Sequence, residues 1–110
     1  MRGIMQAQSL LLHRLIDHAD RYHGETEIVS RRVEGDIHRT NWSGIAGRSR
    51  QVANALDRLG VAAGERVATL AWNGYRHLET YFGVSGSQRV LHTLNPRLVP
   101  AQLSWIINHA

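Results

Sequence analysis

Apolar residues recur every three or four positions in two early stretches, which is the spacing of one helix face. The first stretch predicts a helix with a packing face formed by Leu11, Leu12, Leu15, Ile16, Ala19 and Tyr22. The second predicts a helix that Asn41 or Ser43 caps, that runs to about Leu59 and that ends at Gly60. Its predicted buried face is Ile45, Ser49, Val52, Leu56 and Leu59. Between them, 28–30 and 37–40 flank the turn-forming stretch 33–36 and predict a β-hairpin.

The second half alternates strand-like and helix-like patterns. Residues 66–71 are apolar enough to predict a strand buried on both faces. Asn73 is the predicted cap of the next helix, whose apolar positions are Leu78, Tyr81 and Phe82. A second strand is predicted at 90–94, followed by a break at Asn95-Pro96. Pro100 then begins a last helix carrying Leu103, Ile106 and Ile107.

This order of elements predicts an α/β fold with an edge β-hairpin, then parallel strands alternating with helices. Two buried strands are too few for a sheet covered by helices on both faces. We therefore expect residues 1–110 to form a single partial domain, the front of a larger one, with residues 1–25 as an N-terminal helix and its lead-in.

Composition removes several classes of chemistry. The 110 residues contain no cysteine, which excludes disulfides, thiolate metal sites and cysteine nucleophiles. All 13 basic residues are arginine, so lysine-dependent phosphate loops and Schiff bases are absent from this chain. The net charge is +4 and the arginines are dispersed among acids, with Arg31-Arg32 the only adjacent pair, so no nucleic-acid partner is predicted. The early apolar run 10–12 is too short for a membrane span or a secretory signal, and a cytoplasmic location is expected.

No catalytic or metal-binding motif emerges from the residues themselves. His13, His18 and His23 are five positions apart and turn away from one another around a helix, so they cannot share an ion. The stretch 83–87 is not the Gly-x-Ser-x-Gly of a hydrolase, and 72–74 has one glycine where a dinucleotide fingerprint needs three. We predict no catalytic residue and no metal ligand here.

Three blocks of sequence carry a family resemblance. The first joins 26–31 with 37–42, and the second runs over 53–61 and 64–73. The third is the string His-Thr-Leu-Asn-Pro-Arg-Leu at 92–98, preceded by Leu91 and followed by 106–110. Together they resemble the start of an AMP-forming acyl-CoA synthetase of the fatty-acid kind, within the adenylate-forming superfamily.

The resemblance implies a ligase that uses ATP, Mg²⁺ and CoA in two steps, forming an acyl-adenylate and then a thioester. Its phosphate-binding loop, its nucleotide contacts and its catalytic lysine would follow the stretch seen here, so this fragment is expected to bind none of these cofactors. The implied partners are a fatty acid and CoA. A homodimer is also implied, with the opening helix as a plausible contact.

Candidate residues on the substrate path are His92, Asn95 and Arg97. The loop that carries them leaves the carboxyl end of a predicted parallel strand, where open α/β sheets bind ligands. This placement motivates the hypothesis of a role near the acyl or CoA path. The structural interpretation, which is favoured, makes Asn95-Pro96 a turn and Arg97 an anchoring ion pair.

The sequence departs from the family pattern at two places. Gln88-Arg89 stands where the family has a small Gly-Ala pair entering the strand, so we expect poor packing there and a higher melting temperature for Arg89→Ala. Gly44 stands where a capping box would have an acid, and Gly44 and Gly47 are each expected to cost the helix about 1 kcal/mol.

The leading functional hypothesis is the N-terminal portion of an ATP-dependent fatty-acid–CoA ligase, inactive alone. The alternatives are a non-catalytic α/β interaction module, whose exposed apolar faces pair with another chain, and a gene remnant. An arginine-rich nucleic-acid binder is disfavoured by the dispersion of the charge.

Overall fold

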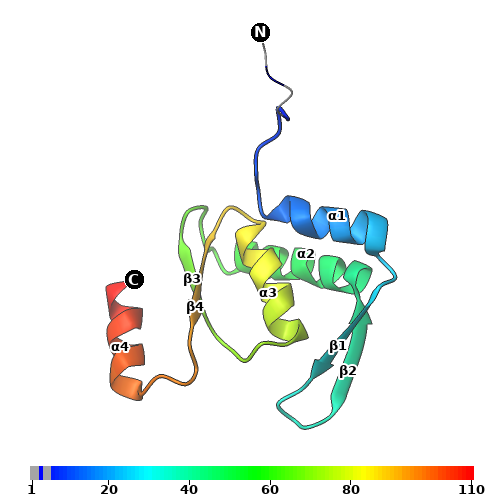
Figure 1. Cartoon of the computed structure of the whole chain (residues 1–110). Helices are drawn as coiled ribbons and strands as arrows, with labels where there is room; N and C mark the ends of the chain where they lie inside the picture. The colour runs from blue at the N-terminus through cyan, green and yellow to red at the C-terminus, as the bar shows by residue number, and fades with distance from the viewer. Residues whose placement is uncertain (1–2, 4–5) are drawn as a thin grey trace.

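The computed structural model describes residue 3 and residues 6–110, so part of the predicted lead-in, residues 1–2 and 4–5, lies outside the described residues. The elements follow the predicted order: α1 (His13–His23), β1 (Glu27–Arg31), β2 (Ile37–Asn41), α2 (Trp42–Arg58), β3 (Arg66–Leu70), α3 (Tyr75–Ser85), β4 (Val90–Leu94) and α4 (Pro100–His109). The predicted α/β architecture, a hairpin followed by parallel strands alternating with helices, is confirmed (Figure 1).

The strands form two separate two-stranded sheets. β1 and β2 pair antiparallel, with Ser30 opposite His38. β3 and β4 pair in parallel, with Thr69 opposite Thr93 and Leu70 opposite Leu94. In Figure 1 the helix α3 lies between the hairpin and the β3–β4 pair, and α4 follows β4 on the far side of that pair.

The core lies where α1, α2 and α3 meet. Ile16 from α1 is buried against Ile45 and Ala46 from α2. Half-buried side chains from the hairpin, from the start of α2 and from α3 surround them: Ile28, Trp42, Tyr75, Leu78 and Phe82. Asp20 of α1 binds α2 through Ser43, whose hydroxyl donates to its carboxylate at 2.7 Å, and through Arg50 at 3.0 Å. The helices are thus joined by apolar burial at the centre and by polar contacts at the rim.

Two of the helix ends predicted from the sequence are confirmed, and one predicted cap is wrong. Asn41 caps α2, because its side-chain oxygen accepts from the Gly44 backbone N–H at 2.8 Å. Gly60 lies just beyond α2 with φ of +76°, the left-handed conformation expected of a helix-ending glycine. Asn73 does not cap α3: the cap position is Gly74, and the Asn73 side chain turns to His77 instead.

Two of the glycines are required by close approaches. A Cβ on Gly83 of α3 would lie 2.6 Å from the Cβ of Val52 and 2.8 Å from the Ser49 carbonyl oxygen, so only glycine lets α3 come this near to α2. A Cβ on Gly44 would lie 2.6 Å from the Thr40 hydroxyl. Gly47 faces open space. Of the two helix glycines Gly44 and Gly47, only Gly47 therefore lowers helix stability without making room for a neighbouring atom.

Several predicted burial patterns are wrong. Of the predicted face of α1, Ile16 is buried, whereas Leu11, Leu12, Leu15 and Tyr22 are exposed. Leu59 at the end of α2 is 76% exposed. In β3 the exposure alternates along the strand, with Leu70 exposed and Val67 half-buried, so β3 is not buried on both faces. An apolar side chain favours burial, but it is buried only where a neighbouring element packs against it.

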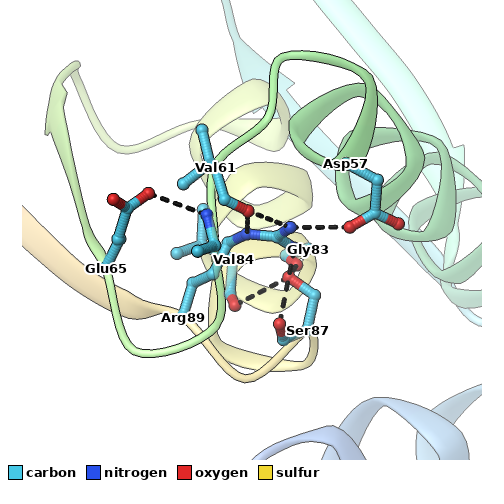
Figure 2. A network of polar contacts seen from close by, with 8 residues as sticks. Asp57, Val61, Glu65, Gly83, Val84, Ser87 and Arg89 are labelled. Atoms are coloured by element: carbon cyan, nitrogen blue, oxygen red, sulfur yellow. Dashed lines mark hydrogen bonds and ion pairs between the residues drawn. The ribbon is translucent and has the colours of Figure 1, made fainter.

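Arg89 overturns the expectation of poor packing at the start of β4. Its side chain is only 5% exposed, and all three guanidinium nitrogens donate hydrogen bonds (Figure 2). The guanidinium donates to the Asp57 carboxylate at 2.6 Å and to the Val61 carbonyl oxygen at 2.9 and 2.5 Å. A third acceptor is the Ser87 carbonyl oxygen at 3.4 Å. Small residues at 88–89 would let the helix and strand backbones come close together. Arg89 instead connects β4 to the end of α2 through charged hydrogen bonds.

At Gln88 the unfavourable feature is the backbone conformation rather than the predicted poor packing. Its φ is +62°, a conformation that glycine adopts without cost and other residues adopt rarely. The side chain is exposed, so it does not disturb packing. Its carbonyl oxygen accepts from the Gly64 N–H at 2.8 Å, and this bond holds the turn against the loop before β3.

We expect Arg89→Ala to lower the stability of the chain rather than raise it. The substitution leaves the Val61 carbonyl without its guanidinium donor, which costs about 1–3 kcal/mol and lowers the melting temperature by about 5 °C or more. Thermal unfolding followed by circular dichroism measures this. Arg39→Ala, which removes only the exposed ion pair with Glu27, is the matched control and should change little. A higher melting temperature for Arg89→Ala would show that the buried guanidinium is not stabilising.

A pair of glycine substitutions tests the contact between α2 and α3. Gly83→Ala should destabilise by about 1–3 kcal/mol, because the new methyl group meets Val52 and the backbone of α2. Gly47→Ala should stabilise by about 1 kcal/mol, because it adds helix propensity in open space. Urea unfolding of both variants measures whether each substitution raises or lowers the free energy of unfolding. Equal effects would mean that the two helices do not approach as closely as described.

Candidate functional site

A groove of about 680 Å³ opens at the carboxyl ends of β3 and β4. It is bounded by the hairpin, by the loop between β3 and α3, by one side of α3 and by the residues that follow β4. The parallel pairing brings the carboxyl ends of β3 and β4 to one edge of the sheet, and the loops that follow both strands begin there. Open α/β sheets usually bind ligands at such an edge. The lining residues are Ser30, Ala71, Asn73, Gly74, Tyr75, His77, Leu78, Tyr81, Thr93, Leu94, Asn95 and Pro96.

The wall formed by the hairpin is attached to α3 by an aromatic stack and an ion pair. The rings of His38 and Tyr75 stack with centroids 3.6 Å apart. The Arg76 guanidinium lies 2.9 Å from the Glu34 carboxylate, and this hydrogen bond lowers the pKa of Glu34 below its ordinary value. Within the hairpin turn, Arg32 pairs with Asp36 and lowers the pKa of that carboxyl group.

His77 lies at the centre of the polar groups in the groove. Its Nε2 is 3.3 Å from the Thr69 hydroxyl oxygen, and its Nδ1 is 3.4 Å from the Asn73 side-chain oxygen. The Asn73 side-chain oxygen can only accept a hydrogen bond, so its contact requires the Nδ1–H tautomer of His77, in which Nε2 can accept from the Thr69 hydroxyl. The array is a hydroxyl, an imidazole and an amide in sequence.

The structure separates the three candidate residues. Asn95 lines the groove, and its side-chain oxygen accepts from the Arg97 backbone N–H at 3.0 Å. The Leu98 N–H donates to the Asn95 carbonyl oxygen at 3.2 Å, so residues 95–98 form a turn. The Arg97 guanidinium lies 5.6 Å from the centre of the Trp72 ring rather than in an ion pair of the described residues. His92 is half-buried on β4 and does not line the groove.

The sequence interpretation passed over the residues that gather in the groove. From the sequence, His77 has no assigned role, and Asn73 is predicted only to cap a helix. The one available signal was the spacing of four residues between them, which places both side chains on one side of the start of α3. Nothing in the sequence placed Thr69 beside His77, because that contact depends on how α3 packs on β3.

No group of three or more potential metal-binding side chains occurs among residue 3 and residues 6–110. In the same part of the chain, no helix has the length and apolar character needed to cross a membrane. The lining of the groove includes no Asp, Glu or Arg.

Residues 15–110 match a family described as AMP-binding enzyme. The chain belongs to this family. The match begins at the third residue of α1 and covers the rest of the helical core, both sheets and the groove. Together with the acyl-CoA ligase relatives, it confirms the predicted resemblance to AMP-forming acyl-CoA synthetases.

Curated relatives in the family are acyl-CoA ligases. The chain is 56% identical over 110 residues to a 3-methylmercaptopropionyl-CoA ligase of Ruegeria pomeroyi, and 44% identical over 110 residues to a medium-chain-fatty-acid–CoA ligase of Ectopseudomonas oleovorans. Both alignments cover 100% of this chain and 20% of the relative. The chain thus spans about a fifth of the length of the relatives that it matches.

Solved structures show the same fold. An anthranilate CoA ligase in complex with anthranoyl-AMP superimposes with a TM-score of 0.74 at 21% identity, over 94% of this chain and 20% of that one. A Mycobacterium tuberculosis fatty acyl CoA synthetase gives a TM-score of 0.60 at 27% identity, over 64% of this chain and 14% of that one. Most of this fold therefore occurs within the much longer anthranilate CoA ligase, and about two thirds of it within the fatty acyl CoA synthetase.

The ion pair behind the groove wall gives a pH prediction. We expect Arg76→Gln to raise the pKa of Glu34, because the hydrogen bond from Arg76 is the largest cause of its lowered value. A lowered carboxyl pKa stabilises the fold at higher pH, and the contribution is lost as the pH falls through that pKa. An NMR titration of the Glu34 carboxyl carbon in both proteins measures the change. An unaltered titration in Arg76→Gln would contradict the described pair.

Proposed function

We propose that this chain is the N-terminal portion of an ATP-dependent fatty-acid–CoA ligase. The observation that carries the proposal is the identity of 56% and 44%, along the whole chain, to ligases that are named for linear carboxylic acids. In the proposed reaction the substrate carboxylate attacks the α-phosphorus of ATP, and pyrophosphate leaves. The thiolate of CoA then attacks the acyl carbon, and AMP leaves with the electrons of the broken bond.

The residues of this chain do not fit the site of the nucleotide and its Mg²⁺. The sequence has no lysine to reach the phosphates, and the described residues hold no cluster of carboxylates for a divalent cation. We infer that ATP, Mg²⁺ and most of the CoA contacts belong to residues outside this chain, and that the chain alone is inactive. Its contribution is a partial domain, residues 1–110, that supplies scaffold and one groove.

A second candidate is a non-catalytic module that binds another chain. It is favoured by the exposed apolar side chains on the β3–β4 sheet and on α4, namely Leu70, Val90, Trp105 and Ile107. Sedimentation at increasing concentration tests this second candidate. Association of the isolated chain is expected only if these side chains form an interface.

A chimera tests the leading proposal. The first fifth of the Ruegeria pomeroyi relative is replaced by this chain, and the exchange of pyrophosphate into ATP is measured with 3-methylmercaptopropionate and with octanoate. We expect acid-dependent exchange from the chimera and none from the isolated chain, because the nucleotide groups come from the remaining four fifths.

The matched control is the relative truncated by the same fifth, which should be inactive. Exchange catalysed by the isolated chain, or a folded chimera without exchange, would contradict the proposal. Thermal unfolding of the chimera shows whether it is folded.

A further inference from the structure

The loop between β3 and α3 carries a chemically reactive pair of residues. Asn73 is followed by Gly74, and both residues line the groove. A glycine at this position matters because it has no Cβ to obstruct the approach of its backbone nitrogen to the preceding side chain. No other asparagine of this chain is followed by glycine, because the residues after the others are Trp42, Ala55, Pro96 and His109.

The fold leaves both reacting groups accessible. Asn73 is exposed, and within residue 3 and residues 6–110 its side chain has one hydrogen-bond contact, to Nδ1 of His77 at 3.4 Å. This distance is long for a hydrogen bond, so the contact restrains the Asn73 side chain only weakly. The Gly74 N–H precedes the first turn of α3 and donates no hydrogen bond within the part of the chain that the structure describes.

The remaining asparagines lack this combination. Asn54 lies within α2 and Asn108 within α4, where the backbone N–H that follows each of them bonds to a carbonyl group one turn earlier. The side chain of Asn41 is held as the cap of α2. The residue after Asn95 is a proline, which has no N–H at all. Asn54 and Asn108 therefore serve as internal references for the reactivity of Asn73.

We propose that Asn73 is a site of spontaneous covalent modification, in which its side chain closes onto the Gly74 nitrogen and is converted to aspartate or isoaspartate. The Gly74 nitrogen gives up its proton and bonds to Cγ of Asn73. Ammonia then leaves with that proton and the electron pair of the broken Cγ–Nδ2 bond. Water opens the resulting succinimide: cleavage at Cγ gives aspartate, and cleavage at the main-chain carbonyl gives isoaspartate.

The reaction changes the groove. The lining of the groove includes no Asp, Glu or Arg, so the product carboxylate introduces a charge there and lowers the net charge of +4 by one. Isoaspartate also lengthens the main chain between β3 and α3 by one methylene group. The proposal concerns the loop itself and does not depend on the proposed ligase function.

Incubation of the folded 110-residue chain in ¹⁸O-enriched water, at neutral and at mildly alkaline pH, is the test. Peptide mass spectrometry follows the gain of one labelled oxygen at each asparagine. We expect Asn73 to react at least about tenfold faster than Asn54 and Asn108. The rate should rise with pH, because the deprotonated amide nitrogen is the nucleophile. Enzymatic methylation of isoaspartyl carboxyl groups should label the same peptide.

Gly74→Ala is the matched variant. The backbone of Gly74 is extended, with φ of −168° and ψ of −177°, and nothing lies within 4 Å of an added Cβ, so the fold should be preserved. The new methyl group should slow the reaction at Asn73 about tenfold, because it obstructs ring closure. Gly47→Ala, which also adds a Cβ in open space, is the control and should leave the rate at Asn73 unchanged.

A rate at Asn73 no greater than the rates at Asn54 and Asn108 would overturn the proposal, because the fold would then protect the loop. An unchanged rate in folded Gly74→Ala would show that water attacks the side chain directly. If Gly74→Ala does not fold, the products from the unaltered chain decide. Ring closure gives isoaspartate, whereas direct hydrolysis gives aspartate alone, so an absence of isoaspartate would also contradict the proposal.

Discussion

The fold depends on how closely α3 approaches α2. Gly83 has no side chain, so the backbone of α3 rests against Val52 and against the carbonyl of Ser49. Ser49 is buried and donates its hydroxyl to the Ile45 carbonyl, so the polar atoms at the contact remain satisfied. Arg48 and the buried Glu79 add an ion pair between the same two helices at 3.5 Å. α1 and the hairpin pack on this pair of helices, and β4 packs on α3.

Arg89 connects the helical core to the parallel strands. Its guanidinium reaches from the start of β4 to Asp57 near the end of α2 and to the loop that leads into β3 (Figure 2). The Val90 N–H also donates to the Glu65 carbonyl oxygen at 3.0 Å, and this bond aligns the beginnings of the two strands. The same register sets Thr69 opposite Thr93 at the groove. A buried arginine at one end of the sheet thus helps to determine which residues meet at the other end.

The groove follows from these constraints rather than from a recognisable motif. His77 is brought to Thr69 because α3 packs on the sheet, and the hairpin closes one side through the stack of His38 on Tyr75. The exposed apolar side chains of α1 and α4 and of one face of β3 belong to a chain that spans about a fifth of the length of its relatives. The burial predicted for β3 from its composition did not occur, because one face of the strand packs against neighbouring residues and the other is exposed.

The sequence alone determined the order and approximate bounds of the elements, because periodicity, the Asn41 cap and the Gly60 stop act over a few residues. Three blocks of sequence, among them the string at 92–98, were together enough to indicate the family that residues 15–110 match. Only the tertiary structure decided whether a residue that departs from the family pattern is harmful. Arg89 looked costly, and its partners at Asp57 and Val61 are 32 and 28 residues away. Only the tertiary structure showed that Gly83 is required and Gly47 is not, because a missing side chain has consequences only where another helix comes close.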